Sequence, residues 1–299
     1  MGLELEQVRS EINKLIRRVC TSISPDCLEL LKKAREGETE ERARNMLEAM
    51  MENVALAGEV NKPVCQSPGY PTVYVRFGNS FQIDLPAIFS EALISATKEG
   101  YLRPSIVHPL TRANNGDNSG EAVPNFEYEF IPGLDYVEVW ISFKGCGAEL
   151  ANAVKVFTTE QLGKNFSGLK RFILDTVLRA SGIPCPPIGL GIGIGGQIDV
   201  AAKLSRKAIS VRDWRDRHPD PLFAALEEEL LEKINQLGIG PAGTGGRTTA
   251  LAVKIGWAST HTAIAPVAVN FHCWVARRGG LRFYPDGRVE TLLVGGQGA

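Results

Sequence analysis

Three cysteines, Cys65, Cys185 and Cys273, lie far apart along the chain, each in a short stretch crowded with small, polar or proline residues. The stretches read VCQSPG, GIPCPP and FHCWVARRG, and no two of these cysteines form a C-x-x-C pair. A metal or cluster held by them therefore has to be assembled by the fold from three separate loops. Three thiolates on an iron–sulfur cube would leave one iron without a protein ligand, and an open iron is a Lewis acid.

The other cysteines do not suggest a disulfide framework, because six cysteines are few for a chain of 299 residues. Cys20 and Cys27 lie in or beside helical patterns, which predicts that they are small buried hydrophobic residues. Cys146, in the stretch SFKGCGAEL, follows a predicted strand and stands between two glycines. This position is compatible with a side chain that faces a site, and we rank Cys146 below the three cysteines above.

Length and composition are those of an ordinary globular protein. With 299 residues, 44% of them hydrophobic and 22% charged, the chain is long enough for a well-buried core. A net charge of −1 gives no basic field for nucleic acid or an acidic membrane surface. The N-terminal segment alternates charged with apolar residues, unlike a signal peptide, and the longest charge-free stretch, 183–197, is too short and glycine-rich to span a bilayer. We therefore expect a cytoplasmic protein.

Hydrophobic periodicity predicts a mixed α/β fold, with a helical N-terminal region followed by a mixed sheet with flanking helices. Apolar residues recur at helical spacing from Leu3 to Val19, and Ser24-Pro25 is a typical helix start. Further helices are predicted at 38–59, 81–98, 166–180, 197–208 and 221–236, and strands at 72–77, 127–130, 136–143, 248–257 and 265–270, before a hairpin around 285–287. We expect residues 1–299 to form a single domain, with a helical lobe at 1–60 and a second lobe at 61–299.

A long loop at 103–124, rich in Arg, Asn, Asp, Gly and Pro, has no periodicity of its own. Loops of this length inside a compact domain are more often functional than not. Arg103 and Arg112 flank its NNGDN segment and are candidates to clamp carboxylates with two hydrogen bonds each.

Two glycine-rich stretches invite comparison with nucleotide-binding loops. GIGIGG, at 191–196, fits G-x-G-x-x-G, but Cys-Pro-Pro precedes it closely and basic residues follow, so we interpret it as a close-packed turn whose amides open a helix. GIGPAGTGGRTTA, at 238–250, lacks the Gly-Lys-Ser/Thr of a phosphate-binding loop. It is either a flexible turn before a strand or a nest of main-chain amides in which Arg247, Thr248 and Thr249 hold a carboxylate.

His261 is one of four histidines and precedes the Cys273 stretch by a single predicted strand, so it is a candidate neighbour of whatever that cysteine binds. Arg277-Arg278 reads as a solvated pair. Zinc is the alternative metal for three cysteines and His261, although structural zinc sites prefer close C-x₂₋₄-C pairs, which are absent from this sequence.

Six stretches together resemble the α subunit, or N-terminal catalytic region, of the iron–sulfur fumarate hydratase and L(+)-tartrate dehydratase family. They occur in order along nearly the whole chain: CQSPG from Cys65, YLRPSIVHPLTRANNGDN from Tyr101, KGCGAE from Lys144, PCPPIGLGIGIGG from Pro184, LGIGPAGTGGRTTALAV from Leu237 and HTAIAPVAVNFHCWVARRG from His261. The order and number of the motifs make this resemblance more specific than either glycine loop alone.

The resemblance implies that Cys65, Cys185 and Cys273 ligate a [4Fe–4S] cluster whose fourth iron binds the hydroxyl and one carboxylate of a 2-hydroxy dicarboxylate. The residues expected to bind substrate are Gln66, Arg103, Asn118, Gly145 and Arg247, and those expected to take part in catalysis are Ser67 and His261. The family also implies a second part, here expected to be a separate β subunit in an α2β2 assembly because the chain stops at Ala299. That subunit would contribute the catalytic base.

One position departs from the family pattern, because the first motif usually reads Cys-Gln-Asp-Thr-Gly and this chain has Ser67 in place of the aspartate. That aspartate is thought to donate a proton, and general acid–base help is commonly worth about 10²–10⁴ in rate. Another group or a water would then donate the proton, or the substrate differs, or activity is low. Cluster binding should survive, because Ser67 is not a ligand.

The expected reaction is that of a hydro-lyase. The open iron would withdraw charge from the departing hydroxide, and guanidinium groups would stabilise the carbanion-like state. We rank malate and fumarate first as substrates and tartrate second. Two other classes stay open: a relative whose cluster is structural or senses oxidants, with Ser67 marking lost catalysis, and a zinc-dependent lyase.

Overall fold

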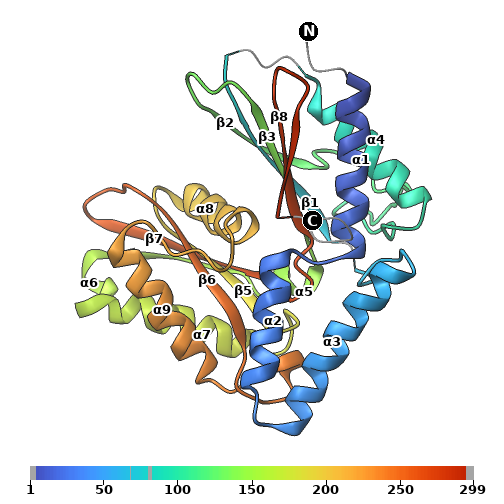
Figure 1. Cartoon of the computed structure of the whole chain (residues 1–299). Coiled ribbons are helices and arrows are strands. Elements are labelled where there is room, and N and C mark those ends of the chain that lie inside the picture. Colours follow the sequence, from blue (N-terminus) through green and yellow to red (C-terminus); the bar gives the residue numbers. More distant parts are fainter. Residues whose placement is uncertain (1–4, 68, 80–82, 294–299) are drawn as a thin grey trace. The chain divides into compact units, whose positions relative to one another are not determined.

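The structure, a computed structural model, describes residues 5–67, 69–79 and 83–293 (Figure 1). The chain divides into two compact units. Unit 1 comprises Met1–Pro25, Glu52–Lys144 and Val275–Ala299, and unit 2 comprises Asp26–Met51 and Gly145–Trp274. Residues 26–51 are thus grouped with the second half of the chain, whereas the rest of the first sixty residues belong to unit 1. That residues 1–299 act as one domain stays a prediction.

Unit 1 is built on a five-stranded sheet with the order β2-β1-β3-β8-β9. β1 and β2 are parallel, and the other neighbouring strands are antiparallel. The strands are β1 (Tyr70–Phe77), β2 (Asn125–Phe130), β3 (Val137–Lys144), β8 (Arg278–Phe283) and β9 (Val289–Leu292). The strands and the hairpin predicted for this part of the chain are confirmed.

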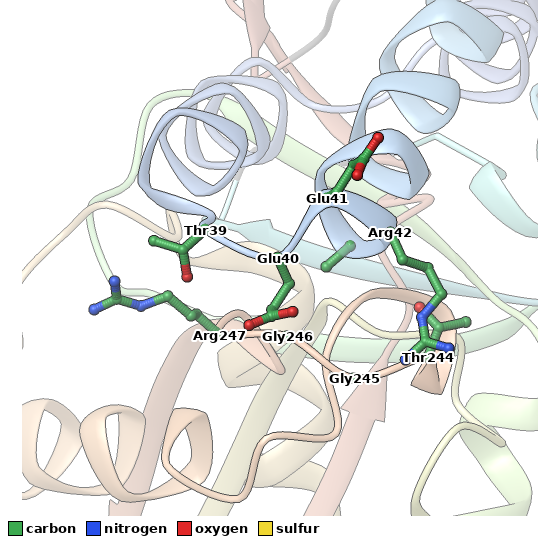
Figure 2. A pocket seen from close by; sticks show the side chains of 9 residues that line it. Thr39, Glu40, Glu41, Arg42, Thr244, Gly245, Gly246 and Arg247 are labelled. Atoms are coloured by element: carbon green, nitrogen blue, oxygen red, sulfur yellow. The ribbon is translucent and has the colours of Figure 1, made fainter.

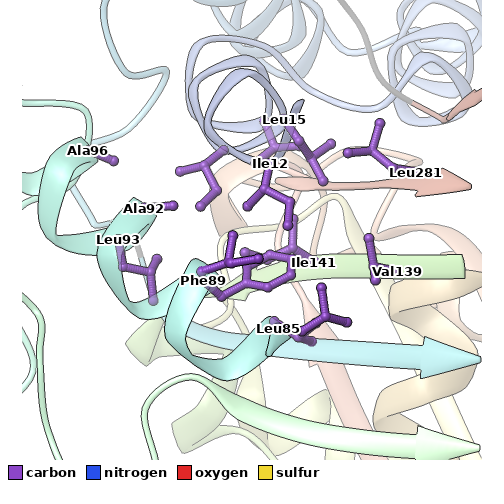
Figure 3. Packing of buried hydrophobic residues seen from close by; sticks show 14 of the residues in the cluster. Ile12, Leu15, Leu85, Phe89, Ala92, Leu93, Ala96, Val139, Ile141 and Leu281 are labelled. Carbon is purple, nitrogen blue, oxygen red and sulfur yellow. The ribbon is translucent and has the colours of Figure 1, made fainter. Parts of the chain in front are cut away.

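Two helices of unit 1, α1 (Leu5–Thr21) and α4 (Leu85–Lys98), share one apolar core with this sheet, as Figure 3 shows. Each presents apolar residues at helical spacing toward the strands. Side chains at the centre of this core are at most 2% exposed: Ile12, Leu15, Phe89, Leu93 and Ile141.

α4 begins later than the predicted start at residue 81. The Asp84 carboxylate accepts a 3.0 Å hydrogen bond from the Ala87 amide, and Pro86 stands in the first turn, which together define a helix start at Leu85. Residues 81 and 82 of the predicted helix, and Leu3 of the first helical pattern, lie outside the described residues.

Unit 2 contains a four-stranded sheet with the order β4-β7-β5-β6. β5 and β6 are parallel, whereas β7 is antiparallel to both of its neighbours, β4 and β5. The strands are β4 (Ala153–Thr158), β5 (Ile188–Gly195), β6 (Ala250–Ala258) and β7 (Ile264–His272). The predicted strands at 248–257 and 265–270 are confirmed as β6 and β7, whereas the sequence analysis missed β4 and β5.

Helices cover both faces of this second sheet. α7 (Ser167–Ala180) and α9 (Pro221–Asn235) build the core on one face, and α8 (Ile198–Val211) packs on the other (Figure 1). The remaining helices are α2 (Pro25–Gly37), α3 (Glu41–Glu59), α5 (Cys146–Leu150) and α6 (Thr159–Leu162), with short 3₁₀ turns at Lys164–Phe166 and Pro241–Gly243. The mixed α/β class predicted from the sequence is therefore confirmed.

The prediction that residues 191–196 form a close-packed turn is wrong, because all but the last belong to β5. In a strand, successive side chains point to opposite faces. Leu190 and Ile192 enter the core beneath α7 and α9, and the intervening glycines lie against α8. A Cβ on Gly193 would collide with the Ala201 carbonyl, so the repeat of glycine is what lets α8 pack this closely on the sheet.

Other expectations are also settled by the fold. Cys20 and Cys27 are buried, with 1% and 0% exposure, as predicted. Among the residues that the structure describes, no helix is long and apolar enough to cross a membrane.

Candidate active site

The Cys65 loop of unit 1 runs from the end of α3 to β1 and is held by main-chain contacts on its N-terminal side. The Val64 amide donates to the Cys20 carbonyl at 3.0 Å, and the Asn53 side chain donates to the Val64 carbonyl at 2.9 Å. After the cysteine the chain turns, so that the Ser67 amide lies 3.4 Å from the Cys65 Sγ. Cys65 itself is partly exposed. The thiol is therefore presented from a fixed loop and already accepts a main-chain N–H.

Arg277 contacts the same loop. Its Nη1 donates to the Cys65 carbonyl at 3.2 Å, and its Nη2 donates to the Ser67 carbonyl. Arg277 and Arg278 are only 2% and 1% exposed, so the interpretation of these residues as a solvated pair is wrong. The sequence carried one signal of this burial: Arg278 begins β8 and Arg277 directly precedes it, with apolar and glycine residues on either side of the pair.

The long loop at 103–124 lies beside the Cys65 loop. The Asn61 side chain donates to the Tyr101 hydroxyl at 2.8 Å, and the Tyr70 hydroxyl donates to the Ala122 carbonyl, also at 2.8 Å. The first contact is made by a residue before Cys65 and the second by a residue after it. Both sides of the Cys65 loop are therefore bonded to the ends of the long loop. Unit 1 therefore brings Gln66 and Ser67 into the same region as the loop that begins at Arg103.

Asn118 organises this long loop from within. Its Oδ1 accepts from the Ser105 and Ile106 amides at 2.8 and 3.2 Å, and its Nδ2 donates to the Thr97 hydroxyl at 2.9 Å and to the Arg103 carbonyl at 3.1 Å. The side chain is 5% exposed. A side-chain amide can make four hydrogen bonds, so Asn118 has no capacity left for a substrate. Its geometry is that of a residue that positions Arg103.

Charges in this loop differ in their surroundings. The Arg103 guanidinium is exposed and has no hydrogen-bond or ion-pair partner among the described residues. The Asp117 carboxylate accepts from the Ser119 hydroxyl at 2.6 Å and from the Ser119 amide at 2.9 Å, and the hydroxyl contact in particular lowers the pKa of the carboxyl. Arg103 is thus a cation of this loop that is open to a ligand.

In unit 2 the sheet brings Cys185 and Cys273 to one end. β5 and β7 are antiparallel, with Gly189 opposite His272, so the loop before β5 meets the loop after β7. The Trp274 amide lies 3.4 Å from the Cys185 carbonyl. Cys185 itself has a left-handed φ of 55°, a conformation that is uncommon for residues other than glycine.

The Gly145–Gly147 segment approaches the same loop. Gly145 is buried and precedes α5, and Gly147 lies so close to the Ile183 carbonyl that a Cβ would collide with it. The segment can therefore lie against the Cys185 loop only if this position carries no side chain. Cys146, between the two glycines, is exposed.

His261 is not brought to this end of the sheet. It lies in the turn between β6 and β7, where its Nδ1 accepts from the Ala263 amide at 3.2 Å. Cys273 follows the other end of β7, a strand of nine residues that spans roughly 30 Å. The expectation that His261 lies beside Cys273 therefore fails within unit 2, because a strand that separates two residues in sequence also holds them apart.

The glycine-rich stretch before β6 faces the loop between α2 and α3, and Figure 2 shows the residues that surround the hollow between them. The hollow has a volume of about 640 Å³ and is lined by Thr39–Ala43 and Thr244–Arg247. The Arg247 amide donates to the Glu38 carboxylate at 2.8 Å, while its exposed guanidinium points away from Arg42. The two guanidiniums do not converge on one point.

The thiols have the chemistry that an iron–sulfur cluster requires. All six cysteines lie in the described part of the chain, and none forms a disulfide. Cys65, Cys185 and Cys273 are partly or well exposed, in contrast to the buried Cys20 and Cys27. Cys65 belongs to unit 1, and Cys185 and Cys273 belong to unit 2. Within either unit, the described residues contain no group of three or more His, Cys, Asp or Glu side chains that could hold a metal ion.

Comparison with known proteins points in one direction. Residues 9–282 match the family model described as fumarate hydratase (Fumerase). A protein of Methanocaldococcus jannaschii, provisionally named as an L(+)-tartrate dehydratase subunit alpha, is 40% identical over 288 residues, which covers 95% of this chain and 100% of the relative. The L(+)-tartrate dehydratase subunit alpha of Escherichia coli strain K12 is 33% identical over 276 residues, which covers 92% of this chain and 90% of that protein. The protein of the same name from Shigella boydii gives the same values.

Proposed function

The chain belongs to the fumarate hydratase family, and from this premise we propose that it is the α subunit of an iron–sulfur hydro-lyase that reversibly dehydrates a 2-hydroxy dicarboxylate. The single observation that carries the proposal is a match that extends over residues 9–282, together with relatives that align over 90–100% of their own length. Similarity over whole chains, rather than over one motif, argues for a shared reaction.

The proposed cofactor is a [4Fe–4S] cluster held by Cys65, Cys185 and Cys273. Three observations support this ligand set: none of these thiols is in a disulfide, none is fully buried, and the loops of Cys185 and Cys273 meet at one end of a sheet. When bound, such a cluster supplies a Lewis-acidic iron that can withdraw charge from a departing hydroxide. Cys146, whose segment lies against the Cys185 loop, is not included because the resemblance to the family places the ligands at the other three cysteines.

The protein's own residues would bind and orient the substrate. We propose that the Arg103 guanidinium binds a substrate carboxylate, because it is exposed and has no partner among the described residues. Gln66 and Ser67 lie in the adjoining loop and are available for further polar contacts, and Gly145 would contribute its main-chain amide. Asn118 would act by fixing Arg103. Substrate contact by Arg247 stays a prediction from the sequence.

Proton transfer involves Ser67 and a group from a second subunit. A Ser67 hydroxyl is a far poorer proton donor than the aspartate expected at this position, so we propose that it orients a water rather than donating its own proton. The base would come from a β subunit, which the names of the relatives as alpha subunits support. The α2β2 stoichiometry, a catalytic role for His261 and a cytoplasmic location stay predictions.

Two substrates are candidates. The family name supports malate and fumarate, which we rank first from the sequence. L(+)-tartrate is the second candidate, and a specific observation favours it: the relatives with 33–40% identity reported above carry that name. L-Malate and L(+)-tartrate are both diacids with a 2-hydroxyl group, so the same guanidinium contacts serve either one.

The test is anaerobic coexpression of the chain with a β-type partner, followed by iron and sulfide analysis and by turnover of L-malate, fumarate and L(+)-tartrate. We expect the fully loaded protein to contain four iron and four sulfide per chain. We also expect it to turn over at least one of the three substrates. Serine variants of Cys65, Cys185 and Cys273 should each lose iron, whereas C146S should retain it. A cluster-loaded complex that turns over none of the three substrates would favour the sensing alternative, and a zinc-containing, iron-free protein would favour the zinc lyase.

A further inference from the structure

Arg277 is a buried cation that lies against the loop of a proposed cluster ligand. Two of its guanidinium nitrogens donate to main-chain carbonyls, those of Cys65 and Ser67, on either side of Gln66. The side chain is 2% exposed. A planar guanidinium that holds two carbonyls fixes their relative orientation, which a single hydrogen bond does not do. The conformation of the loop between the two carbonyls is therefore tied to Arg277.

The backbone of Arg277 is itself well fixed. Its carbonyl accepts from the Phe143 amide at 2.9 Å, and the next residue begins β8, which pairs with β3. The guanidinium thus extends from the sheet of unit 1 into the Cys65 loop. Within that loop the Ser67 amide lies 3.4 Å from the Cys65 Sγ. Hydrogen bonds to ligand sulfurs are one of the ways in which proteins tune iron–sulfur clusters.

The charge of Arg277 has no counterpart in the described part of the chain. No carboxylate there forms an ion pair with it, and its Nε is buried without a hydrogen-bond partner. Burying an unpaired cation is costly, so a buried arginine without an acid indicates a negative group outside the described residues. In its usual oxidised state a [4Fe–4S] core carries a 2+ charge, so three thiolate ligands give the cluster a net negative charge.

We propose that Arg277 is the positioning residue of the Cys65 ligand loop, and that its unpaired charge is balanced by the cluster that this loop ligates. This inference rests on the proposed function. It assigns two separable roles to one side chain: the two-carbonyl contact orients the Cys65 loop, and the positive charge stabilises the bound anionic cluster.

Two variants separate these roles. R277K keeps the positive charge but cannot hold both carbonyls with a planar fork, whereas R277Q keeps a donor group and removes the charge. R282K is the matched control. Arg282 lies in β8, close to Arg277 in sequence, but it pairs with Glu138 at 2.6 Å rather than with the Cys65 loop. All three variants are prepared anaerobically with the β partner, and circular dichroism verifies that each one folds.

Three measurements follow: iron and sulfide per chain, the rate at which a chelator removes iron, and the paramagnetic resonance spectrum of the chemically reduced protein. Groups that support metal ligands typically contribute about 10- to 100-fold in metal affinity, so we expect both Arg277 variants to lose iron about 10- to 100-fold faster than wild type. The difference in unfolding midpoint between loaded and cluster-free protein should shrink most in R277Q. R282K should match wild type in iron release and in the resonance spectrum.

The proposal is overturned if R277K and R277Q release iron as slowly as R282K and give the wild-type resonance spectrum. Should R277Q fail to fold, the iron-release rate of R277K alone decides the positioning role. Failure of the proposed function is a different result: there, wild-type protein itself would hold no iron–sulfur cluster or would turn over no hydroxy diacid.

Discussion

The main-chain amide of Arg247 donates a 2.8 Å hydrogen bond to the carboxylate of Glu38, 209 residues earlier in the chain. The same carboxylate accepts from the amides of Thr39 and Glu40 at 2.9 and 3.1 Å. The glycine-rich stretch thus does use a main-chain amide to bind a carboxylate, one of the two readings that the sequence left open. The carboxylate is the protein's own, and the Arg247 guanidinium stays exposed.

Replacing Glu38 should therefore act on stability. E38A leaves three main-chain amides without their acceptor at a site where Glu38 is 3% exposed. Unsatisfied buried donors each cost about 1–3 kcal/mol, and some of these amides can reach water, so we expect a loss of about 2–3 kcal/mol in the free energy of unfolding. Urea denaturation measures it. E36A, which removes an exposed carboxylate from the same helix end, should change the value by less than about 0.5 kcal/mol.

Local sequence signals predicted α9, whose start is marked by a capping residue and a proline. α9 begins where Asp220 caps it and Pro221 opens it, and the predicted range of 221–236 is one residue longer than the helix. β5 was missed for the opposite reason. Its glycines signalled a turn, and only the approach of α8 explains why a strand carries them. Packing between elements distant in sequence cannot be read from the pattern of one segment.

Gly193 tests this explanation directly. In G193A the new Cβ would collide with the Ala201 carbonyl of α8, so either the helix or the strand has to shift. Overpacking of this kind costs about 1–3 kcal/mol, which should appear as a lower urea midpoint with an unchanged slope. Gly58 of α3 is the matched position, since a Cβ there meets nothing within 4 Å. G58A should leave stability unchanged or raise it by up to about 1 kcal/mol. Equal effects of the two changes would contradict the packing argument.

Arg103 and Asn118 were both predicted to bind substrate, and the structure places their side chains in different surroundings. R103A removes an exposed guanidinium without a partner, so we expect stability within about 0.5 kcal/mol of wild type and a large rise in KM. N118A removes four hydrogen bonds from a buried side chain and should lower the free energy of unfolding by about 1–3 kcal/mol. Turnover of the coexpressed complex and thermal unfolding, measured on both variants, separate the two roles. An N118A variant as stable as wild type would contradict the structural role that these four hydrogen bonds assign to Asn118.

The candidate site shows the same division between local and distant information. Thiol chemistry and motif order make Cys65, Cys185 and Cys273 candidate ligands without a structure, because ligand type is a property of the residue. The surroundings of those residues depend on the fold and cannot be read from the residues themselves. Arg277 carries no signal of its own that it will hold the Cys65 loop, since that contact joins segments 210 and 212 residues apart. His261 shows the opposite error. Its closeness to Cys273 in sequence suggested that the two side chains are neighbours, but the extended strand β7 separates them.

Burial of the Cys20 thiol should make the free energy of unfolding fall at alkaline pH. Burial raises the pKa of its thiol from 9.0 to about 12, although the charge of Arg277 acts in the opposite direction. Above about pH 9 the unfolded chain releases this proton while the folded chain retains it, so the folded state loses stability as pH rises toward 12. One group contributes up to about 1.4 kcal/mol per pH unit in this window. Urea denaturation between about pH 8 and about pH 10.5 should therefore show a steeper decline for wild type than for C20A. C146A, which removes an exposed thiol, should decline in parallel with wild type, and identical slopes for all three proteins would mean that Cys20 ionises in the folded state.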